Sequence, residues 1–188
     1  MDLTEAIHSR RAVRAYTQAS IDTATIRKLI DAAIQAPSAV NTQPWSFTVI
    51  QGPALLARIS RESKEIVLRD PPRGLPAGHF REVLSDPKFD IFYGAPTLIV
   101  ISSVRDDHWA VVNCSLAAQN LMLAARGEGL GTCWIGFAEG WLRTEGARRA
   151  LDLPQSYLPV APIIVGRPIS FPDPVPRNEP VIHWIASQ

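Results

Sequence analysis

The stretch Ser9-Arg10-Arg11-Ala12-Val13-Arg14 is the first of two segments that decide how this sequence is interpreted. It carries three arginines within five residues, and a guanidinium group binds a phosphate through paired, charge-assisted hydrogen bonds. The second segment is Ala36-Pro37-Ser38-Ala39-Val40-Asn41-Thr42-Gln43-Pro44-Trp45. Its hydroxyl and amide side chains, with free backbone N–H groups, can bind the polar edge of a flat heterocycle. Together the two segments predict a site for a phosphorylated aromatic cofactor.

Each segment also has a simpler interpretation. Arginines at the end of a first helix can form a solvated cationic terminus, which the helix dipole favours. The second segment can be a helix terminator with an asparagine turn. However, Ser38, Asn41 and Gln43 supply more polar side chains than a terminator requires. The occurrence of both segments in one chain therefore favours the cofactor site.

The composition is that of an ordinary globular protein. A length of 188 residues favours a single domain over residues 1–188. Hydrophobic residues make up 46% and charged residues 20% of the chain, both typical values. The formal net charge of +1 provides no strong field toward nucleic acid or anionic lipid. We therefore expect neither nucleic acid nor a membrane as a partner, and we interpret the arginines as a local site.

Several other kinds of chemistry are excluded by residue type and spacing. Cys114 and Cys133 are too few for a disulfide framework or a four-ligand zinc site, and their apolar surroundings are typical of buried thiols. The four histidines lack the spacing of metal ligands, so no metal is expected. The sequence shows no nucleophile–base motif, no export signal and no long apolar span, which predicts a cytoplasmic protein. If the chain is an enzyme, a cofactor carries its chemistry.

The apolar pattern predicts a mixture of helices and strands. Helices are expected over residues 2–10, from Asp22 to before Pro37, from Pro53 to about Leu68, over Asp106–Arg126 and over Trp141–Ala150. Strands are expected over Ser46–Gln51, Thr97–Ile101, Leu130–Phe137 and Val160–Val165, and a loop-rich excursion over residues 70–94. The Asp106–Arg126 helix is apolar on nearly all sides, which is typical of a central helix or of a subunit interface.

Four motifs in order give the chain a resemblance to the FMN-dependent nitroreductase family. They are Ser-Arg-Arg-Ala-Val-Arg, Ala-Pro-Ser-Ala-Val-Asn-Thr-Gln-Pro-Trp, Gly-Ala-Pro-Thr-Leu-Ile-Val and Gly-Leu-Gly-Thr-Cys-Trp-Ile-Gly. The resemblance implies an α+β fold with a central mixed sheet wrapped by helices. It also implies an intertwined homodimer with two FMN sites at the subunit interface, and so a dimer role for the apolar Asp106–Arg126 helix.

The resemblance also implies a set of FMN contacts. Arg10 and Arg11 correspond to the phosphate side, where Ala12 replaces the serine of many members, and Arg14 to the N1–C2 carbonyl edge of the flavin. Pro37, Ser38, Ala39, Asn41 and Gln43 form the segment that would hold the ring from the partner subunit. Ile135 and Gly136 would lie along the flavin with a backbone N–H toward N5, and Arg177 resembles a second phosphate-binding residue.

The activity implied by the resemblance is reduction of bound FMN by NADH or NADPH. Electrons then pass to a small acceptor, such as a nitroaromatic, a quinone or free flavin, in a ping-pong mechanism. Three alternatives stay open at this point: a flavin store or sensor without turnover, an enzyme that fragments reduced FMN, and one that dehalogenates or dehydrogenates. Bleaching of a bound yellow cofactor by NAD(P)H distinguishes an enzyme from a store.

Overall fold

The computed structural model describes residues 1–71 and 77–186. Its elements in chain order are α1 (Leu3–Ser9), α2 (Thr23–Ala33), the 3-10 helix η1 (Ala39–Asn41), β1 (Trp45–Ile50), α3 (Pro53–Arg69), α4 (Ala77–Ser85), β2 (Thr97–Ser103), α5 (Ala110–Gly127), β3 (Gly131–Trp134), the 3-10 helix η2 (Gly136–Ala138), α6 (Glu139–Leu142), α7 (Glu145–Leu151) and β4 (Leu158–Gly166). Asp22 caps α2 as expected, since its carboxylate accepts a hydrogen bond from Thr25 N at 2.8 Å. The elements confirm the predicted α+β class.

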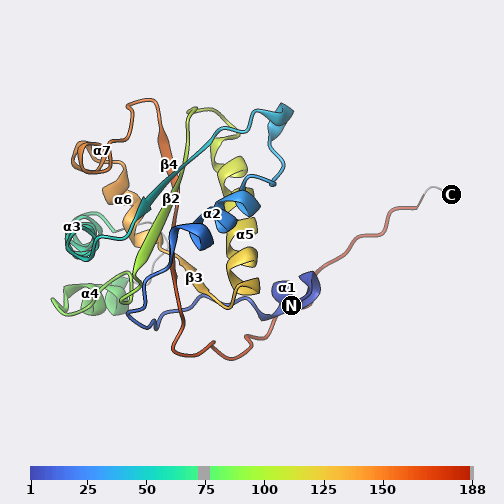
Figure 1. Ribbon diagram of the computed structural model, residues 1–188, viewed down its shortest axis with the longest axis horizontal. Coiled ribbons are helices and arrows are strands. Elements are labelled where there is room, and N and C mark those ends of the chain that lie inside the picture. Colours follow the sequence, from blue (N-terminus) through green and yellow to red (C-terminus); the bar gives the residue numbers. More distant parts are fainter. Residues whose placement is uncertain (72–76, 187–188) are drawn as a thin grey trace.

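A single four-stranded sheet lies at the centre of the fold, in the order β1-β2-β4-β3. Helices α2 and α5 cover one face of this sheet, and α3 and α6 cover the other (Figure 1). Strand β2 contributes to both layers: Leu98 and Val100 pack on the α3 side, whereas Ile99 and Ile101 pack on the α5 side. Burial on both faces explains why this strand is a continuous apolar run in the sequence.

The segment that carries the arginines lies along the β3 edge of the sheet. Ala12 forms a parallel bridge with Thr132, and Val13 N donates to Thr132 O at 3.0 Å. The buried Tyr16 hydroxyl then donates to Val13 O at 2.8 Å. The four strands pair antiparallel throughout. The sheet was expected to be mixed, but its four strands are antiparallel. Among the described residues, the parallel pairing is limited to the isolated Ala12–Thr132 bridge, because the arginine segment is too short to form a further strand.

Three predicted elements have different bounds in the structure. The strand expected over Leu130–Phe137 ends at Trp134, because the chain turns into η2 directly after Ile135. The helix expected over Trp141–Ala150 is divided into α6 and α7, because extended Thr144 interrupts it and caps α7. The excursion expected to be loop-rich contains α4, whose apolar residues Phe80, Val83 and Leu84 have helical spacing. Residues 72–76 of that excursion lie outside the described residues.

Helix α5 is the central helix, as its apolar pattern predicted. Eight of its residues are buried, and it packs against α2, α1 and strands β2, β3 and β4. Nevertheless, Val111, Val112 and Leu116 are exposed on one of its sides, as is Trp109 just before it. Within the described ranges no helix has both the length and the hydropathy to cross a membrane.

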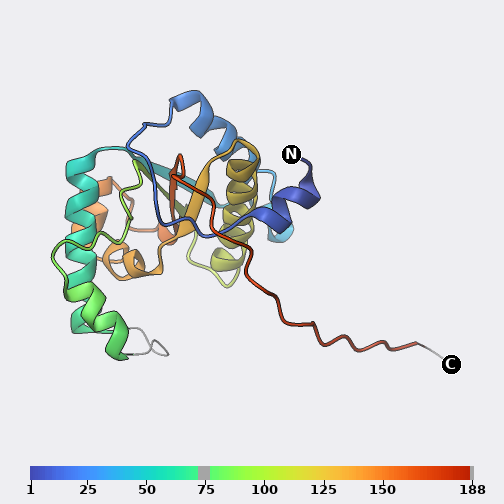
Figure 2. The ribbon, with the colours of Figure 1, turned by 90° about the horizontal axis from the view of Figure 1, so that it is seen from below.

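The chain leaves the body of the protein after β4. Figures 1 and 2 show the last segment passing close to α1 and then running outward in an extended form. Its apolar residues are exposed, including Val181 at 84%, Trp184 at 88% and Ile185 at 96%. An apolar segment of this kind is typical of a surface that another chain covers.

Substitution of Gly166 tests the packing of the arginine segment on the sheet. An alanine Cβ at Gly166 would lie 2.5 Å from Tyr16 Cδ1 and 2.9 Å from Pro96 Cδ. We expect Gly166→Ala to lower the free energy of unfolding by about 1–3 kcal/mol, the usual effect of overpacking. Gly127→Ala is the control, because a Cβ there meets no atom within 4 Å. Chemical denaturation measures both variants, and equal stabilities would contradict the close approach of Tyr16.

Candidate functional site

Arg10 and Arg14 lie on the same part of the sheet edge, beside β3. Burial raises the pKa of the Cys133 thiol, and the positive charges of Arg14 and Arg10 both act on this thiol in the opposite direction. Both positive charges therefore act on the same residue of β3, from positions that follow the end of α1. Within the described residues no carboxylate forms an ion pair with either arginine. This edge of the sheet therefore carries two positive charges without a carboxylate partner among the described residues.

Tyr93 lies under Arg14. The guanidinium carbon is 5.8 Å from the centroid of the Tyr93 ring, a cation–π geometry. Tyr93 has a φ of 54° and the next residue, Gly94, a φ of 72°, so two consecutive left-handed residues turn the chain here. Burial raises the pKa of the Tyr93 hydroxyl, while the positive charge of Arg14 acts in the opposite direction. Sequence reasoning missed Tyr93, because a cation–π contact across the fold leaves no local signal.

Arg11 has a different orientation from the one expected of a phosphate ligand. Its Nη1 donates to His8 O at 2.7 Å and to Arg10 O at 2.8 Å, so this side chain binds the end of α1. Its Nε is buried and has no hydrogen-bond partner among the described residues. A buried donor without an acceptor is costly, and an anion at this position would satisfy it. Arg11 therefore binds the end of α1 through Nη1, while its buried Nε–H has no partner among the described residues.

Ile135 and Gly136 follow β3 and lie next in the chain to the cationic edge. Ile135 is 4% exposed, and its N–H donates to Pro162 O at 2.8 Å. Its backbone donor is therefore already used. Gly136 is exposed, and a Cβ added there would meet only the Glu139 carboxylate at 3.9 Å, so the space above this backbone is open. Phe137, directly after it, meets Phe80 of α4 edge-to-face at 5.6 Å.

The loop from Pro37 to Gln43 is stabilised by its own polar side chains. Gln43 N donates to Ser38 Oγ at 2.9 Å, and Gln43 Nε2 donates to Asn41 Oδ1 at 3.0 Å. Val40, Asn41 and Gln43 have φ values of 52°, 54° and 45°, which place three residues other than glycine in the left-handed region. Strained residues of this kind cost about 1–3 kcal/mol each and concentrate at functional sites.

The loop and the arginines lie at opposite ends of α5. Ala39 N donates to Asn113 Oδ1 at 3.1 Å, near the start of the helix. Ser9 Oγ accepts a hydrogen bond from Arg126 Nε at 2.9 Å, in the last turn. At 1.5 Å per residue, these two positions on the helix are about 20 Å apart. Figure 1 shows the same separation, with the loop above α5 and α1 below it. The structure therefore brings Arg10, Ala12, Arg14, Ile135 and Gly136 to one edge and leaves Pro37–Gln43 apart from them.

Arg177 lies on the exposed tail and makes no hydrogen bond or ion pair with the described residues. The tail begins at the same end of α5 as Arg10, since the Arg126 guanidinium lies 3.8 Å from the centroid of the Phe171 ring. Arg126 therefore joins Ser9 and the start of the tail. Among the described residues, no hydrogen bond or ion pair fixes the position of Arg177 relative to Arg10 or Arg126.

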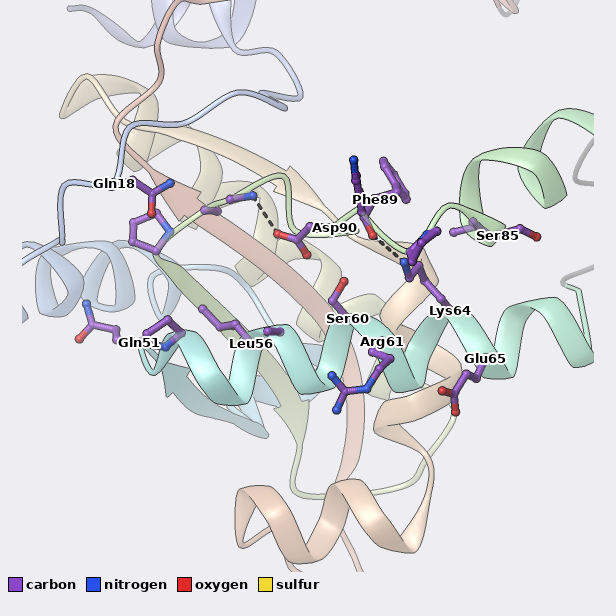
Figure 3. Close-up of a pocket in the computed structure, with 18 of the residues that line it drawn as sticks. Gln18, Gln51, Leu56, Ser60, Arg61, Lys64, Glu65, Ser85, Phe89 and Asp90 are labelled. Carbon is purple, nitrogen blue, oxygen red and sulfur yellow. Dashed lines mark hydrogen bonds between the residues drawn. The ribbon is translucent and has the colours of Figure 1, made fainter.

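A cavity of about 920 Å³ lies elsewhere, between α3 and residues 84–96 (Figure 3). The buried Lys64 ammonium donates to Asp86 O at 2.9 Å and to Phe89 O at 2.7 Å. Ser60 Oγ accepts a hydrogen bond from Ile91 N at 3.1 Å. These bonds hold residues 86–91 against α3. None of the residues predicted to contact FMN lines this cavity, so it is separate from the cationic edge.

The cationic edge fits an anionic, flat ligand such as FMN. Among the described residues, it provides guanidinium groups without a carboxylate partner, one buried N–H without an acceptor and an open glycine backbone. No cluster of three metal-ligating side chains occurs in residues 1–71 and 77–186. The arrangement can bind and orient a negatively charged cofactor.

The model of the Nitroreductase family matches residues 7–167. The chain belongs to the nitroreductase family. A nitrobenzene nitroreductase of Ectopseudomonas oleovorans is 30% identical to this family member over 199 aligned positions, covering 87% of this chain and 86% of the relative. A Methanothermobacter thermautotrophicus protein, provisionally named NADH dehydrogenase/NAD(P)H nitroreductase, is 32% identical over 176 residues, covering 92% of this chain and 80% of the relative.

Solved structures agree on the fold of this family member. A nitroreductase with bound FMN from Bacteroides fragilis superposes with a TM-score of 0.84 at 24% identity, covering 99% of this chain and all of the other. An iodotyrosine deiodinase bound to FMN and 3-iodo-L-tyrosine superposes with a TM-score of 0.76 at 21% identity, covering 98% of this chain and all of the other. The family suggested by the sequence motifs is therefore confirmed, and identities this low support the fold alone.

The buried thiol Cys114 predicts how stability depends on pH. Burial raises its pKa to about 12, compared with about 8.5 in an unfolded chain. The folded state therefore holds a proton that the unfolded state loses as the pH rises above about 8.5, and each such proton lowers the free energy of unfolding by about 1.4 kcal/mol per pH unit. The number of protons released on unfolding sets the slope of the free energy of unfolding against pH. We expect Cys114→Ala to lower that number by about one between pH 9 and 10.5. Denaturation at several pH values measures it, and an unchanged slope would contradict the raised pKa.

Proposed function

We propose that this nitroreductase-family chain is an FMN-dependent oxidoreductase that takes electrons from NADH or NADPH. The observation that carries the proposal is the pair Arg10 and Arg14, neither of which forms an ion pair within the described residues, on the sheet edge that leads to the open backbone of Gly136. FMN combines a phosphate with a flat ring whose edges accept hydrogen bonds, and both parts match this edge. The names of the relatives and the FMN in the related structures support the same cofactor. The proposal treats residues 1–188 as one FMN-binding domain.

In this proposal the residues of the cationic edge have separate roles. Arg10 binds the phosphate, with the buried Nε of Arg11 as a further donor and Arg177 of the tail as a second cation. Ala12 lies between them without a hydroxyl to add. Arg14 lies at the N1–C2 carbonyl edge of the flavin, where its position is fixed by the Tyr93 ring.

The backbone after β3 would hold the reactive side of the ring. Ile135 forms a buried apolar floor, and its N–H is already bonded to Pro162 O. The N–H of Gly136 is therefore the donor that we assign to flavin N5. Because Gly136 is exposed, a second planar molecule can stack at the same place.

FMN, when bound, supplies the redox chemistry by accepting a hydride from NAD(P)H and giving electrons to an acceptor. The residues of this chain bind and orient it. The Arg14 cation favours negative charge at the N1 edge and so makes reduction easier, while solvent supplies protons. In this proposal, NAD(P)H and the electron acceptor bind in turn at the same open side of the flavin, beside Gly136, which is a ping-pong scheme. Nitroaromatics are the acceptor class that the names of two relatives support; quinones and free flavin are further candidates.

The proposed enzyme is a homodimer in which each FMN site contains residues of both chains. Within one chain α5 holds the loop and the arginines about 20 Å apart along its axis. A second copy can bring its Pro37–Gln43 loop to the cationic edge of the first. The exposed Trp109, Val111, Val112 and Leu116 provide an apolar interface at α5, and the exposed tail provides a segment that covers the partner.

An absorbance spectrum tests the proposed activity. We expect purified protein supplied with FMN to show flavin bands that NADH or NADPH bleaches without oxygen, and an added nitroaromatic to restore them. Bands that NAD(P)H leaves unchanged would indicate a store or sensor instead. Loss of the flavin itself after aerobic turnover would indicate fragmentation, and protein that retains no FMN would overturn the proposal.

A mixed dimer tests whether the loop acts on the partner. One chain carries Arg10→Ala and Arg14→Ala, and the other carries Val40→Pro. Proline cannot adopt the φ of 52° found at Val40, while the Val40 side chain is 96% exposed, so core packing is retained. We expect each variant homodimer to lose FMN affinity and the mixed dimer to regain it at one site per dimer.

Two differently tagged chains allow the mixed dimer to be purified, and titration with FMN gives its affinity and stoichiometry. If each loop serves its own chain, the mixed dimer has no intact site and binds as weakly as the two homodimers. A wild-type protein that is monomeric at working concentration contradicts the dimer directly.

A further inference from the structure

Asn113 is an exception in helix α5. It is one of the buried residues of a helix that is otherwise apolar on nearly all sides, with only 2% of its surface exposed. A buried amide is costly unless it is hydrogen-bonded. Its Oδ1 accepts the Ala39 N–H at 3.1 Å, across 74 residues of sequence. The amide therefore serves the Pro37–Gln43 loop and contributes nothing to the bonding of the helix itself.

The loop depends on such a contact because its backbone is unfavourable. Val40, Asn41 and Gln43 are left-handed. Asparagine tolerates this conformation, whereas valine and glutamine adopt it only where their surroundings enforce it. The Ser38–Gln43 and Asn41–Gln43 hydrogen bonds close the loop on itself but do not fix it to the protein. The bond to Asn113 attaches the start of η1 to α5, at the point where the loop leaves the body.

From these contacts we infer that Asn113 is a positioning residue for FMN binding: it holds the Pro37–Gln43 loop in the strained form that binds the partner subunit's flavin. This inference rests on the proposed function, because the loop matters to FMN only if the dimer site is correct. Val111, Val112 and Leu116 on the same helix are exposed toward the proposed interface. One helix thus carries both the dimer face and the residue that fixes the loop, so dimer formation and flavin binding depend on the same element.

Three variants in helix α5 distinguish the positioning of the loop by Asn113 from a general effect on packing. Asn113→Leu removes the acceptor but keeps a side chain that branches at Cγ, whereas Asn113→Asp keeps an oxygen at the same place. Asn120→Leu is the matched control: Asn120 lies on the same helix, and its Nδ2 donates to Ala32 O at 3.2 Å, in the last turn of α2 and outside the Pro37–Gln43 loop. We expect Asn113→Leu to raise the dissociation constant for FMN about tenfold, equivalent to about 1.4 kcal/mol, and Asn113→Asp to restore most of the affinity. Asn120→Leu should leave it within about twofold, even if stability falls in all three.

A variant on the loop side keeps the inference testable if Asn113→Leu does not fold. Ala39→Pro removes the N–H that Asn113 accepts. Ser38 already has a φ of −137° and a ψ of 151°, the conformation that a residue before proline adopts. Both changes delete the same hydrogen bond. The double variant should therefore bind FMN no more weakly than whichever single variant has the lower FMN affinity. Additive losses would show that the two residues act separately.

FMN titration, with the dimer state checked by sedimentation, distinguishes the outcomes. If the wild-type protein does not bind FMN, the proposed function fails. If it binds FMN, and both Asn113→Leu and Ala39→Pro bind equally well, the inference alone is overturned. A weaker affinity in Asn120→Leu equal to that of Asn113→Leu would also overturn it, since a general effect of α5 would then explain both.

Discussion

The hydrogen bond from Val13 N to Thr132 O is the contact on which the candidate site depends. It joins the arginine segment to the edge strand β3, and the buried Tyr16 hydroxyl then holds Val13 from the other side. This pairing fixes the backbone between Arg10 and Arg14, so the two guanidinium groups reach the same strand. Because β3 continues directly into Ile135 and Gly136, one backbone pairing brings the cations to the open glycine. Glycine at positions 131 and 166 allows this close approach, since a Cβ at either would meet Val13 or Tyr16.

Helix α5 determines what one chain can do alone. It packs against every strand of the sheet and so fixes the distance between its two ends. Asn113 binds the loop at one end, and Arg126 binds Ser9 and the Phe171 ring at the other. A rigid helix cannot shorten to bring these ends together. In the dimer proposed above, a second chain would supply the loop that this helix holds away from the arginines of its own chain.

Much of this architecture could be predicted from the sequence, because its signals are local. The Asp22 cap, the apolar run of β2 and the periodicity of α2 all lie within a few residues of the structure that they specify. The arginine pair and the polar loop were also recognisable, as both depend on residue type and spacing. By contrast, the division of Trp141–Ala150 depends on a threonine acting as a cap, and the same residue type is often tolerated within a helix.

Several contacts of the candidate site could not be predicted from the sequence. Arg11 faces the carbonyl groups of α1, and Ile135 uses its N–H on Pro162 of β4. Tyr93 meets Arg14 only in the folded protein. Asn113 did carry a signal, an amide in an apolar helix, which implies a buried partner without naming it. Secondary-structure propensity depends on single residues and their sequence neighbours, whereas these contacts depend on which residues meet in the folded protein.

The exposed tail also has a consequence for how the protein reaches its working form. A newly made chain carries Val181, Trp184 and Ile185 in solvent until something covers them. If a second copy provides that cover, the last step of maturation is bimolecular, and its half-time lengthens as the protein becomes dilute. During that interval the exposed apolar tail can associate with other unfolded chains. The yield of active protein is then set by the rate of synthesis as much as by the stability of the fold.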